Sequence, residues 1–321
     1  MVTGQRGGVV VLGEVLVELS AEEPLERGVF LRLDFSGDAL NAAAAAAAAG
    51  AETMLLARVP DDELGDALLR RAVELGVDCS YVVRAPGQHG LYLTHADPLG
   101  ARQFLYARRG SVGSGLCPED LDPELLRSAA VVLASGVGHA MSSTAGAAVE
   151  QAARLARFFV YDPNLRLRLT TAADASAVLR KLAPLASLVT PSWPDETRLL
   201  LGTDPDGGPG AAARAVLGLG ARAATVTCGE RGVVVADGDG TVEVPALPAA
   251  EVVDQTGAGD SFAGTVAARL ALGDDVVEAG RWGVAAAALS VQGRGGTGFV
   301  ASAEQILAHR AAHERPRVDI E

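Results

Sequence analysis

Short apolar segments alternate with helix-forming segments along most of the chain, and this alternation restricts the possible folds. Strands are predicted at 129–136, 157–164, 186–192, 223–229 and 232–238, and helices at 143–157, 171–183, 194–201, 209–219, 260–272 and 276–290. Strands that are apolar along their whole length are buried on both faces, as in a parallel sheet between two layers of helices. The pattern therefore predicts a three-layer α/β fold with a mainly parallel central sheet.

The N-terminal segments fit the same pattern. "GGVVVLGEVLVEL" (7–19) is typical of a buried opening strand with a glycine break. "NAAAAAAAAG" (41–50) predicts a thin helix that can pack closely on a sheet, because alanine is the best helix former. The amphipathic segment 61–76 predicts a further helix.

Segment 89–111 differs from its surroundings. It contains two short aromatic strands around the turn Pro98-Leu99-Gly100, and it predicts a hairpin that stands apart from the main layers. No change of composition and no internal repeat divides the chain, so one domain over 1–321 is expected.

Charge and cysteine content exclude several classes of function. The net charge of −13 argues against nucleic acid or an anionic membrane as the main partner, since both require a basic surface. Cys79, Cys117 and Cys228 form neither a disulfide framework nor a metal-binding pair. The chain has no signal-peptide pattern and no apolar run of membrane-spanning length, so a cytoplasmic protein is expected.

The stretch "DQTGAGDSF" (254–262) points to an anion site. Apolar residues recur at helical spacing after Asp260, so Gly257, Ala258 and Gly259 form the turn that leads into a helix. Free N–H groups and the positive end of the helix dipole attract phosphate there, and glycine lets the backbone approach it closely. Asp260 is then either a carboxylate that caps the helix or a general base beside the phosphate.

Other phosphate and metal signatures are excluded. Lys181, the only lysine, has no glycine near it and cannot belong to a Walker A loop. "GRGGTG" (293–298) follows a predicted helix, whereas a dinucleotide fold places such a motif after a strand. His309 and His313 lie one turn apart in a predicted terminal helix. Exposure of that helix to solvent accounts for both histidines, so a histidine metal site is not expected.

Together these segments resemble the PfkB, or ribokinase-like, family of sugar kinases. "DQTGAGDSF" is similar to the family's C-terminal signature, segment 36–78 to its N-terminal signature, and "TCGERG" (227–232) to its nucleotide-side turn. Ser36, Pro60 and Gln255 depart from the family pattern without removing a group that the chemistry requires.

The resemblance implies a ribokinase-like fold with a small β-sheet lid, formed by segments 15–35 and 88–112. It implies that Asp260 is the catalytic base and that the 257–260 turn is the anion hole. It also places sugar-binding residues at Gly37, Asp38 and Asn41, and nucleotide-binding residues at Ser192, Thr227, Gly229, Gly232, Gly257 and Gly259.

ATP and Mg²⁺ are the cofactors that the resemblance implies. The family's Asn-x-x-Glu element, which orders Mg²⁺ through water, corresponds to Ser192 followed by Asp195 or Glu196, with Glu196 favoured. Asp254, with Gln255 and the 293–296 loop, is a candidate site for K⁺.

Two arginines bear on the choice of sugar. Arg166 follows a predicted strand in "DPNLR", and Arg108 lies on the same strand face as Tyr106 in the predicted hairpin. Taken singly, each arginine is explained by a surface salt bridge. Together beside one pocket, they suit a carboxylate, because guanidinium offers a matched pair of donors.

The stretches around these arginines resemble the 2-keto-3-deoxygluconate kinases of the family, which implies Tyr92, Tyr106, Arg108 and Arg166 as substrate contacts. We therefore expect ATP-dependent phosphorylation of that sugar acid to 2-keto-3-deoxy-6-phosphogluconate by a homo-oligomer. A fructokinase acting on a neutral sugar and a non-catalytic sugar or nucleotide sensor are the alternatives.

Overall fold

The computed structural model describes residues 8–97, 99 and 102–313, so the predicted turn at 98–100 and the first residue of the 7–19 strand lie partly outside it. The main-sheet strands are β1 (Val9–Leu12), β4 (Thr53–Leu56), β9 (Val131–Ser135), β10 (Phe159–Asp162), β11 (Leu188–Val189), β12 (Ala224–Thr227), β13 (Val233–Asp237) and β14 (Gly240–Val244). They lie in the order β14-β13-β12-β11-β10-β9-β1-β4. All neighbours pair in parallel except β12-β13 and β13-β14.

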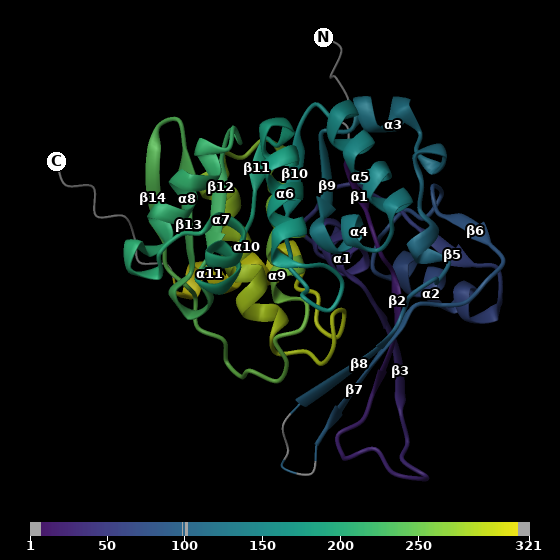
Figure 1. Cartoon of the computed structure of the whole chain (residues 1–321). Coiled ribbons are helices and arrows are strands. Elements are labelled where there is room, and N and C mark those ends of the chain that lie inside the picture. The colour runs from purple at the N-terminus through teal and green to yellow at the C-terminus, as the bar shows by residue number, and fades with distance from the viewer. Residues whose placement is uncertain (1–7, 98, 100–101, 314–321) are drawn as a thin grey trace.

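Helices cover both faces of this sheet (Figure 1). One face carries α1 (Asp38–Ala48), α2 (Glu63–Glu74), α9 (Ala258–Leu272) and α10 (Val276–Ser290), with α11 (Ala303–His313) packed on α10. The other carries α3 (Pro123–Ser128), α5 (Ser143–Leu155), α6 (Ala172–Leu182), α7 (Asp195–Leu201) and α8 (Gly208–Gly218). In β1, Val9 and Val11 join the first core, and Val10 and Leu12 the second. The predicted three-layer fold is confirmed.

Helices α1 and α9 pack unusually closely. Side chains of α1 that face inward are almost all alanine, and Gly264 of α9 faces Ala42 so closely that a Cβ would lie 2.0 Å from the Ala42 carbonyl oxygen. The alanine run is therefore an element of close helix packing, because small side chains let two backbones approach. This contact brings the N-terminal ends of α1 and α9 to the same edge of the sheet (Figure 1).

A second sheet forms a lid that projects from the body (Figure 1). Its strands are β2 (Leu16–Ser20), β3 (Arg32–Ser36), β7 (Leu91–Ala96) and β8 (Arg102–Ala107), in the order β3-β2-β7-β8. The single stretch predicted over 7–19 therefore supplies one strand to each sheet. Two short strands, β5 (Arg58–Pro60) and β6 (Val83–Ala85), form a separate two-stranded sheet. The sequence analysis did not predict these two strands.

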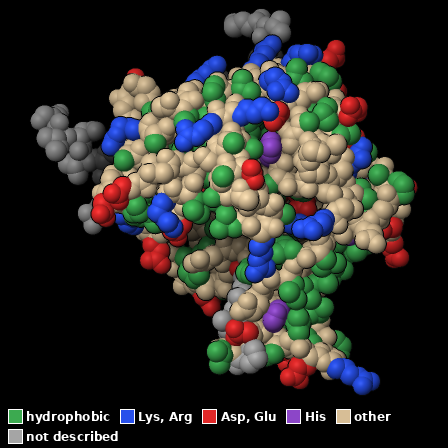
Figure 2. Space-filling model, in the orientation of Figure 1, with side chains coloured by type: hydrophobic (Ala, Val, Ile, Leu, Met, Phe, Trp, Pro, Cys, Tyr) green, Lys and Arg blue, Asp and Glu red, His purple; other side chains and the backbone are tan. Residues whose placement is uncertain are grey.

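The surface of the lid is partly apolar. Figure 2 shows hydrophobic side chains along the projecting part of the molecule. Phe30, Leu33 and Leu105 are each at least half exposed there. No helix in the described part of the chain is long and apolar enough to cross a membrane.

Replacing Gly264 with alanine tests the close packing of α1 and α9. The added methyl group must displace the Ala42 backbone, so we expect a loss of about 1–3 kcal/mol in the free energy of unfolding despite alanine's higher helix propensity. Gly218→Ala, in the last turn of α8 with nothing within 4 Å of the new Cβ, is the matched control and should be neutral or slightly stabilising. Urea unfolding of both variants measures the difference; equal effects would contradict the packing account.

Candidate active site

Polar side chains gather at the carboxyl edge of the parallel strands. Glu14 follows β1, Ser135 ends β9 and Asp162 ends β10. The first turns of α1 and α9 reach the same edge and contribute Asp38, Asn41 and Asp260. In open α/β sheets this edge is where ligands bind.

The N-terminus of α9 presents free donors. The helix begins at Ala258, two residues earlier than the sequence predicts, because Gly257 adopts a left-handed conformation (φ 80°) and caps it. In the described structure the N–H groups of Gly257, Gly259 and Asp260 have no hydrogen-bond acceptor, whereas that of Ala258 donates to the Gln255 carbonyl at 3.3 Å. The predicted anion hole therefore contains three free donors rather than four.

The two glycines of this turn have different functions. A Cβ on Gly257 would lie 3.0 Å from the Gly296 backbone, so glycine is required there by both packing and φ. A Cβ on Gly259 would meet nothing within 4 Å. The backbone at Gly259 thus faces open space in which a phosphate can approach the helix.

Asp260 is buried and held by two amides. Asn41 Nδ2 donates to its Oδ2 at 2.8 Å and Asn164 Nδ2 donates to its Oδ1 at 3.0 Å. Burial raises the pKa of Asp260, while the amide of Asn41, the nearby Arg166 charge and the amide of Asn164 act in the opposite direction. The net effect is a raised pKa, because burial outweighs these three groups.

Two more carboxyl groups surround this base. Asp38 accepts a hydrogen bond from Ser135 Oγ at 2.5 Å, and burial followed by the Asp260 charge raises the pKa of Asp38 to about 6. Burial and the charges of Glu196 and Asp260 also raise the pKa of Asp162 well above its usual range. A cavity lined by Asp38, Asp162 and Asp260 lies between them.

Arg108 is paired with Glu14, which the sequence prediction missed. Arg108 Nη1 lies 2.6 Å from Glu14 Oε2, and both side chains are nearly buried. Glu14 Oε1 and Asp38 Oδ1 are buried without a hydrogen-bond partner in the described structure. Gly37 packs against the Glu14 carbonyl with φ 117°, so this predicted sugar-site glycine brings α1 against the β1–β2 connection.

Arg166 and Glu196 both lie near the loop that follows β10. The Arg166 side chain is exposed, and among described residues no carboxylate forms an ion pair with it. Glu196 accepts N–H bonds at 2.6 Å from both Leu165 and Ser192, and a third bond from Ser192 Oγ at 3.2 Å. The predicted pairing of Ser192 with Glu196 is thus present. Asp195 instead contacts Arg198 on the surface.

The other predicted nucleotide-side residues lie at the ends of β12 and β13. Thr227 pairs with Ser192 as an isolated bridge. Gly229 and Gly232 both have positive φ, and a Cβ on Gly232 would collide with the Val244 carbonyl at 2.1 Å. A Cβ on Gly229 would meet nothing, so this turn is open above the sheet.

The lid approaches the same edge through Tyr106. Its ring lies beneath the guanidinium of Arg108 at 4.7 Å and near that of Arg168 at 5.7 Å. Arg168 also donates to the Phe104 carbonyl at 2.6 Å, which ties the loop after β10 to lid strand β8. Cations over tyrosine faces are attracted by the ring quadrupole. Arg168 is a second residue that the sequence prediction missed.

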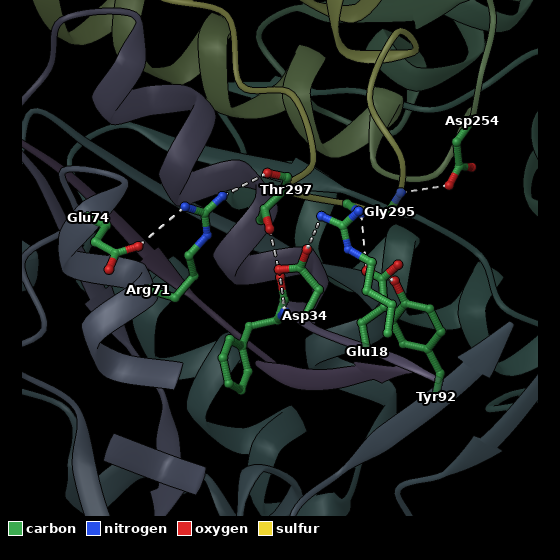
Figure 3. Close-up of polar contacts among 11 residues, drawn as sticks. Glu18, Asp34, Arg71, Glu74, Tyr92, Asp254, Gly295 and Thr297 are labelled. Atoms are coloured by element: carbon green, nitrogen blue, oxygen red, sulfur yellow. Dashed lines mark hydrogen bonds and ion pairs between the residues drawn. The ribbon is translucent and has the colours of Figure 1, made fainter. Parts of the chain in front are cut away.

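Tyr92 forms a hydrogen bond that the sequence did not predict. Its hydroxyl donates to the buried Glu18 carboxylate, which also accepts from Gly296 N at 3.3 Å (Figure 3). Nearby, Asp254 accepts from Gly295 N at 2.7 Å and from Thr256 N at 2.9 Å. Glu18 therefore joins lid strand β2 to the 293–298 loop, and Tyr92 bonds to it from the neighbouring lid strand β7. The substrate contact predicted for Tyr92 stays a prediction.

Metal binding by side chains alone is not supported. The described residues contain no group of three His, Cys, Asp or Glu side chains that could hold a metal ion. Both oxygens of Glu196 accept hydrogen bonds from the chain, which fits contact with Mg²⁺ through water rather than direct ligation. Asp254 orders the loops around the candidate K⁺ position.

The pH dependence of stability tests the environment of Glu14. Burial raises the pKa of Glu14 from 4.5 to about 7, although Arg108 opposes this. The protonated Glu14 side chain is therefore favoured in the folded state. This contribution to the free energy of unfolding is complete below about pH 4.5 and is lost as the pH rises to 7. We expect the free energy of unfolding of wild type, relative to Glu14→Gln, to fall between pH 5 and 7 and then level off. Denaturant titrations across this range measure it, and parallel curves for the two proteins would contradict the assignment.

The chain is similar to known proteins over nearly all of its length. The family model of the pfkB family carbohydrate kinases matches residues 7–302. A 2-dehydro-3-deoxygluconokinase of Thermoproteus tenax is 35% identical over 296 residues, covering 89% of each chain. A fructokinase of Klebsiella pneumoniae is 29% identical over 275 residues, covering 83% of this chain and 85% of that one.

A solved structure extends the similarity to the fold. A putative ribokinase II from E. coli, in complex with ATP and Mg²⁺, superposes with a TM-score of 0.85 at 23% identity, covering 96% of this chain and all of that one. The fold is therefore ribokinase-like, with the four-stranded lid. By the extent of the family match, this chain belongs to the PfkB family of carbohydrate kinases.

Proposed function

We propose that this carbohydrate kinase transfers the γ-phosphoryl group of ATP to 2-keto-3-deoxygluconate and forms 2-keto-3-deoxy-6-phosphogluconate. The observation that carries the proposal is the position of Asp260. In the described structure a buried carboxylate lies at the start of a helix whose N–H groups at Gly257, Gly259 and Asp260 have no acceptor. Arg166 follows β10 on the same side, and Arg108 follows lid strand β8 and pairs with Glu14. The 35% identity to a 2-dehydro-3-deoxygluconokinase supports the choice of sugar.

Asp260 acts as the general base. It accepts the proton of the sugar hydroxyl as that oxygen attacks phosphorus, and the amides of Asn41 and Asn164 hold its carboxylate in place. Because Arg166 is close, its charge favours the ionised form that can accept this proton.

The N–H groups of Gly257, Gly259 and Asp260 stabilise the charge on the moving phosphoryl group. They point from a helix N-terminus that is fixed before substrate arrives, so little reorganisation is required. Thr227, Gly229 and Gly232 form the adjacent open turn for the nucleotide. Mg²⁺, when bound with ATP, would neutralise phosphate charge, with Glu196 placed to order its water ligands.

The substrate pocket suits a polyol with a carboxylate. Within residues 8–97, 99 and 102–313, Glu14 Oε1 and Asp38 Oδ1 are buried acceptors without donors, and sugar hydroxyls are suitable donors for them. The exposed Arg166 is the better receptor for the carboxylate, since it has no acidic partner among the described residues. Tyr106 and Arg108 would close the pocket from the lid side.

One observation favours a neutral sugar instead. The charge of Arg108 is already compensated by Glu14, so Arg108 can serve a scaffold role in a fructokinase-like enzyme. A non-catalytic sensor fits less well, because the base and the free donors are both present. A homo-oligomer that assembles through the apolar lid, a K⁺ site near Asp254 and a cytoplasmic location remain predictions.

The catalytic roles of Asp260 and Gly259 are separable from folding. We expect Asp260→Asn to lose about 10²–10⁴-fold in kcat, because the amide accepts no proton. Gly259→Val projects a side chain into open space, so it should abolish phosphoryl transfer while leaving the unfolding midpoint nearly unchanged. Coupled ADP release and thermal unfolding measure these effects. Full turnover by Asp260→Asn would disprove the base assignment.

The substrate assignment is tested with a panel of sugars. ADP release with Mg-ATP is measured for 2-keto-3-deoxygluconate, gluconate, fructose and ribose, in wild type and in Arg166→Ala. We expect the keto acid to be the preferred substrate and Arg166→Ala to raise its KM at least tenfold, with little change for a neutral sugar. Preference for fructose, with KM insensitive to Arg166, would replace the proposal with the neutral-sugar alternative.

A further inference from the structure

The chain contains only two asparagines, Asn41 and Asn164, and both donate their side-chain amides to Asp260. Asn41 reaches Oδ2 from the first turn of α1, and Asn164 reaches Oδ1 from the loop after β10. The donors are separated from Asp260 by 219 and 96 residues respectively. The two oxygens of the carboxylate are therefore each bonded to an amide from a different layer of the fold.

Asn164 is also unusual in its backbone. It is the one residue other than glycine with a positive φ (40°) in the described ranges 8–97, 99 and 102–313. Its N–H donates to Asp162 Oδ1 at 3.2 Å, which closes a tight turn at the end of β10. Asparagine tolerates the left-handed region better than other residues with a Cβ, and glycine tolerates it without a side chain. Asparagine is therefore the residue that permits this turn and still carries an amide to Asp260.

We propose that Asn164 is a positioning residue for the base, which holds the Asp260 carboxylate in its reactive orientation and in its ionised form. This inference rests on the proposed role of Asp260 and extends it to a residue to which the sequence analysis assigned no role. Asn41 also donates to Asp260, but a substitution there would disturb a second contact as well. It is buried, and its Oδ1 accepts a hydrogen bond from Ser36 at 3.1 Å.

The charges around Asp260 explain why such a residue is required. Burial favours the neutral form of Asp260. Asp38 of α1 and Asp162 of β10 line the same cavity, and the charge of Asp260 raises the pKa of both. Arg166, Asn41 and Asn164 favour its ionised form. Loss of one amide shifts this balance toward a protonated Asp260, which cannot accept the hydroxyl proton.

Three substitutions at position 164 separate the amide from the backbone. Asn164→Gly keeps the positive φ but removes the amide, Asn164→Ala removes the amide and also strains the turn, and Asn164→Asp keeps the shape but replaces the donor with a carboxylate. Positioning predicts that Asn164→Gly folds normally yet loses about tenfold or more in kcat at pH 7, with the KM for ATP within about twofold of wild type.

The pH profile gives the second readout. The acid limb of kcat should move to higher pH in Asn164→Gly and further in Asn164→Asp, where two carboxyl groups about 3 Å apart share a proton. Activity of Asn164→Asp should therefore recover partly as the pH rises to 9. If Asn164 only supports the turn, activity will follow stability instead: Asn164→Gly will be as active as wild type, Asn164→Ala will be impaired, and no acid limb will move. That outcome would overturn the proposal.

A measurement without substrate keeps this inference separate from the choice of sugar. The ¹³C carboxyl resonance of Asp260, assigned by its absence in Asp260→Asn, is titrated in wild type and in Asn164→Gly. We expect a higher pKa of Asp260 in the glycine variant, and an unchanged pKa would overturn the proposal. If wild type phosphorylates no sugar acid but the shift is observed, the substrate proposal fails and the positioning role of Asn164 stands.

Discussion

The structure depends on burying one carboxylate, Asp260, where two helices meet the edge of a sheet. A carboxylate removed from water is costly unless hydrogen bonds or opposite charges compensate for it. Here the compensation comes from residues far apart in the sequence, Asn41 in α1 and Asn164 after β10. The close approach of α1 and α9 at Gly264 and Ala42 makes the first of these bonds possible, so the alanine-rich helix is part of the site and not only of the core.

The same arrangement explains how an acidic protein can handle a polyanion. Its net charge of −13 would repel ATP at a distance, and no excess of lysine offsets it. Attraction is instead local: free N–H groups at the start of α9 and the exposed guanidinium of Arg166 act within a few ångströms. Glu196 and Asp254 accept hydrogen bonds from backbone N–H groups, so these two carboxyl groups order the loops around them.

The sequence predicts the layered fold and the anion turn because both depend on local patterns. Apolar runs and helix periodicity identify β9, β10, α9 and α10, and the glycines mark the turn before Asp260. It could not predict Glu14 as the partner of Arg108, or Asn164 as a partner of Asp260, because these contacts join residues more than 90 positions apart. For Asn164 one signal was available: it is one of only two asparagines, and it lies directly after a buried strand. The hydrogen bond from Tyr92 to Glu18 could not be predicted either, because a strand pattern does not indicate that Glu18 lies opposite it.

The pairing of Arg108 with Glu14 links the lid to the charge of the substrate. Arg108 belongs to the end of lid strand β8, whereas Glu14 follows β1 of the main sheet, so their ion pair joins the two sheets. Burial already raises the pKa of Glu14 to about 7. A carboxylate substrate placed beside Arg108 would add a further negative charge and raise it again, so that binding would take up a proton. A neutral sugar would add no charge and would leave the pKa of Glu14 where burial and Arg108 set it. Under the proposed function, Glu14 would make the charge of the pocket depend on its occupant, and Arg108 would keep a partner with either kind of sugar.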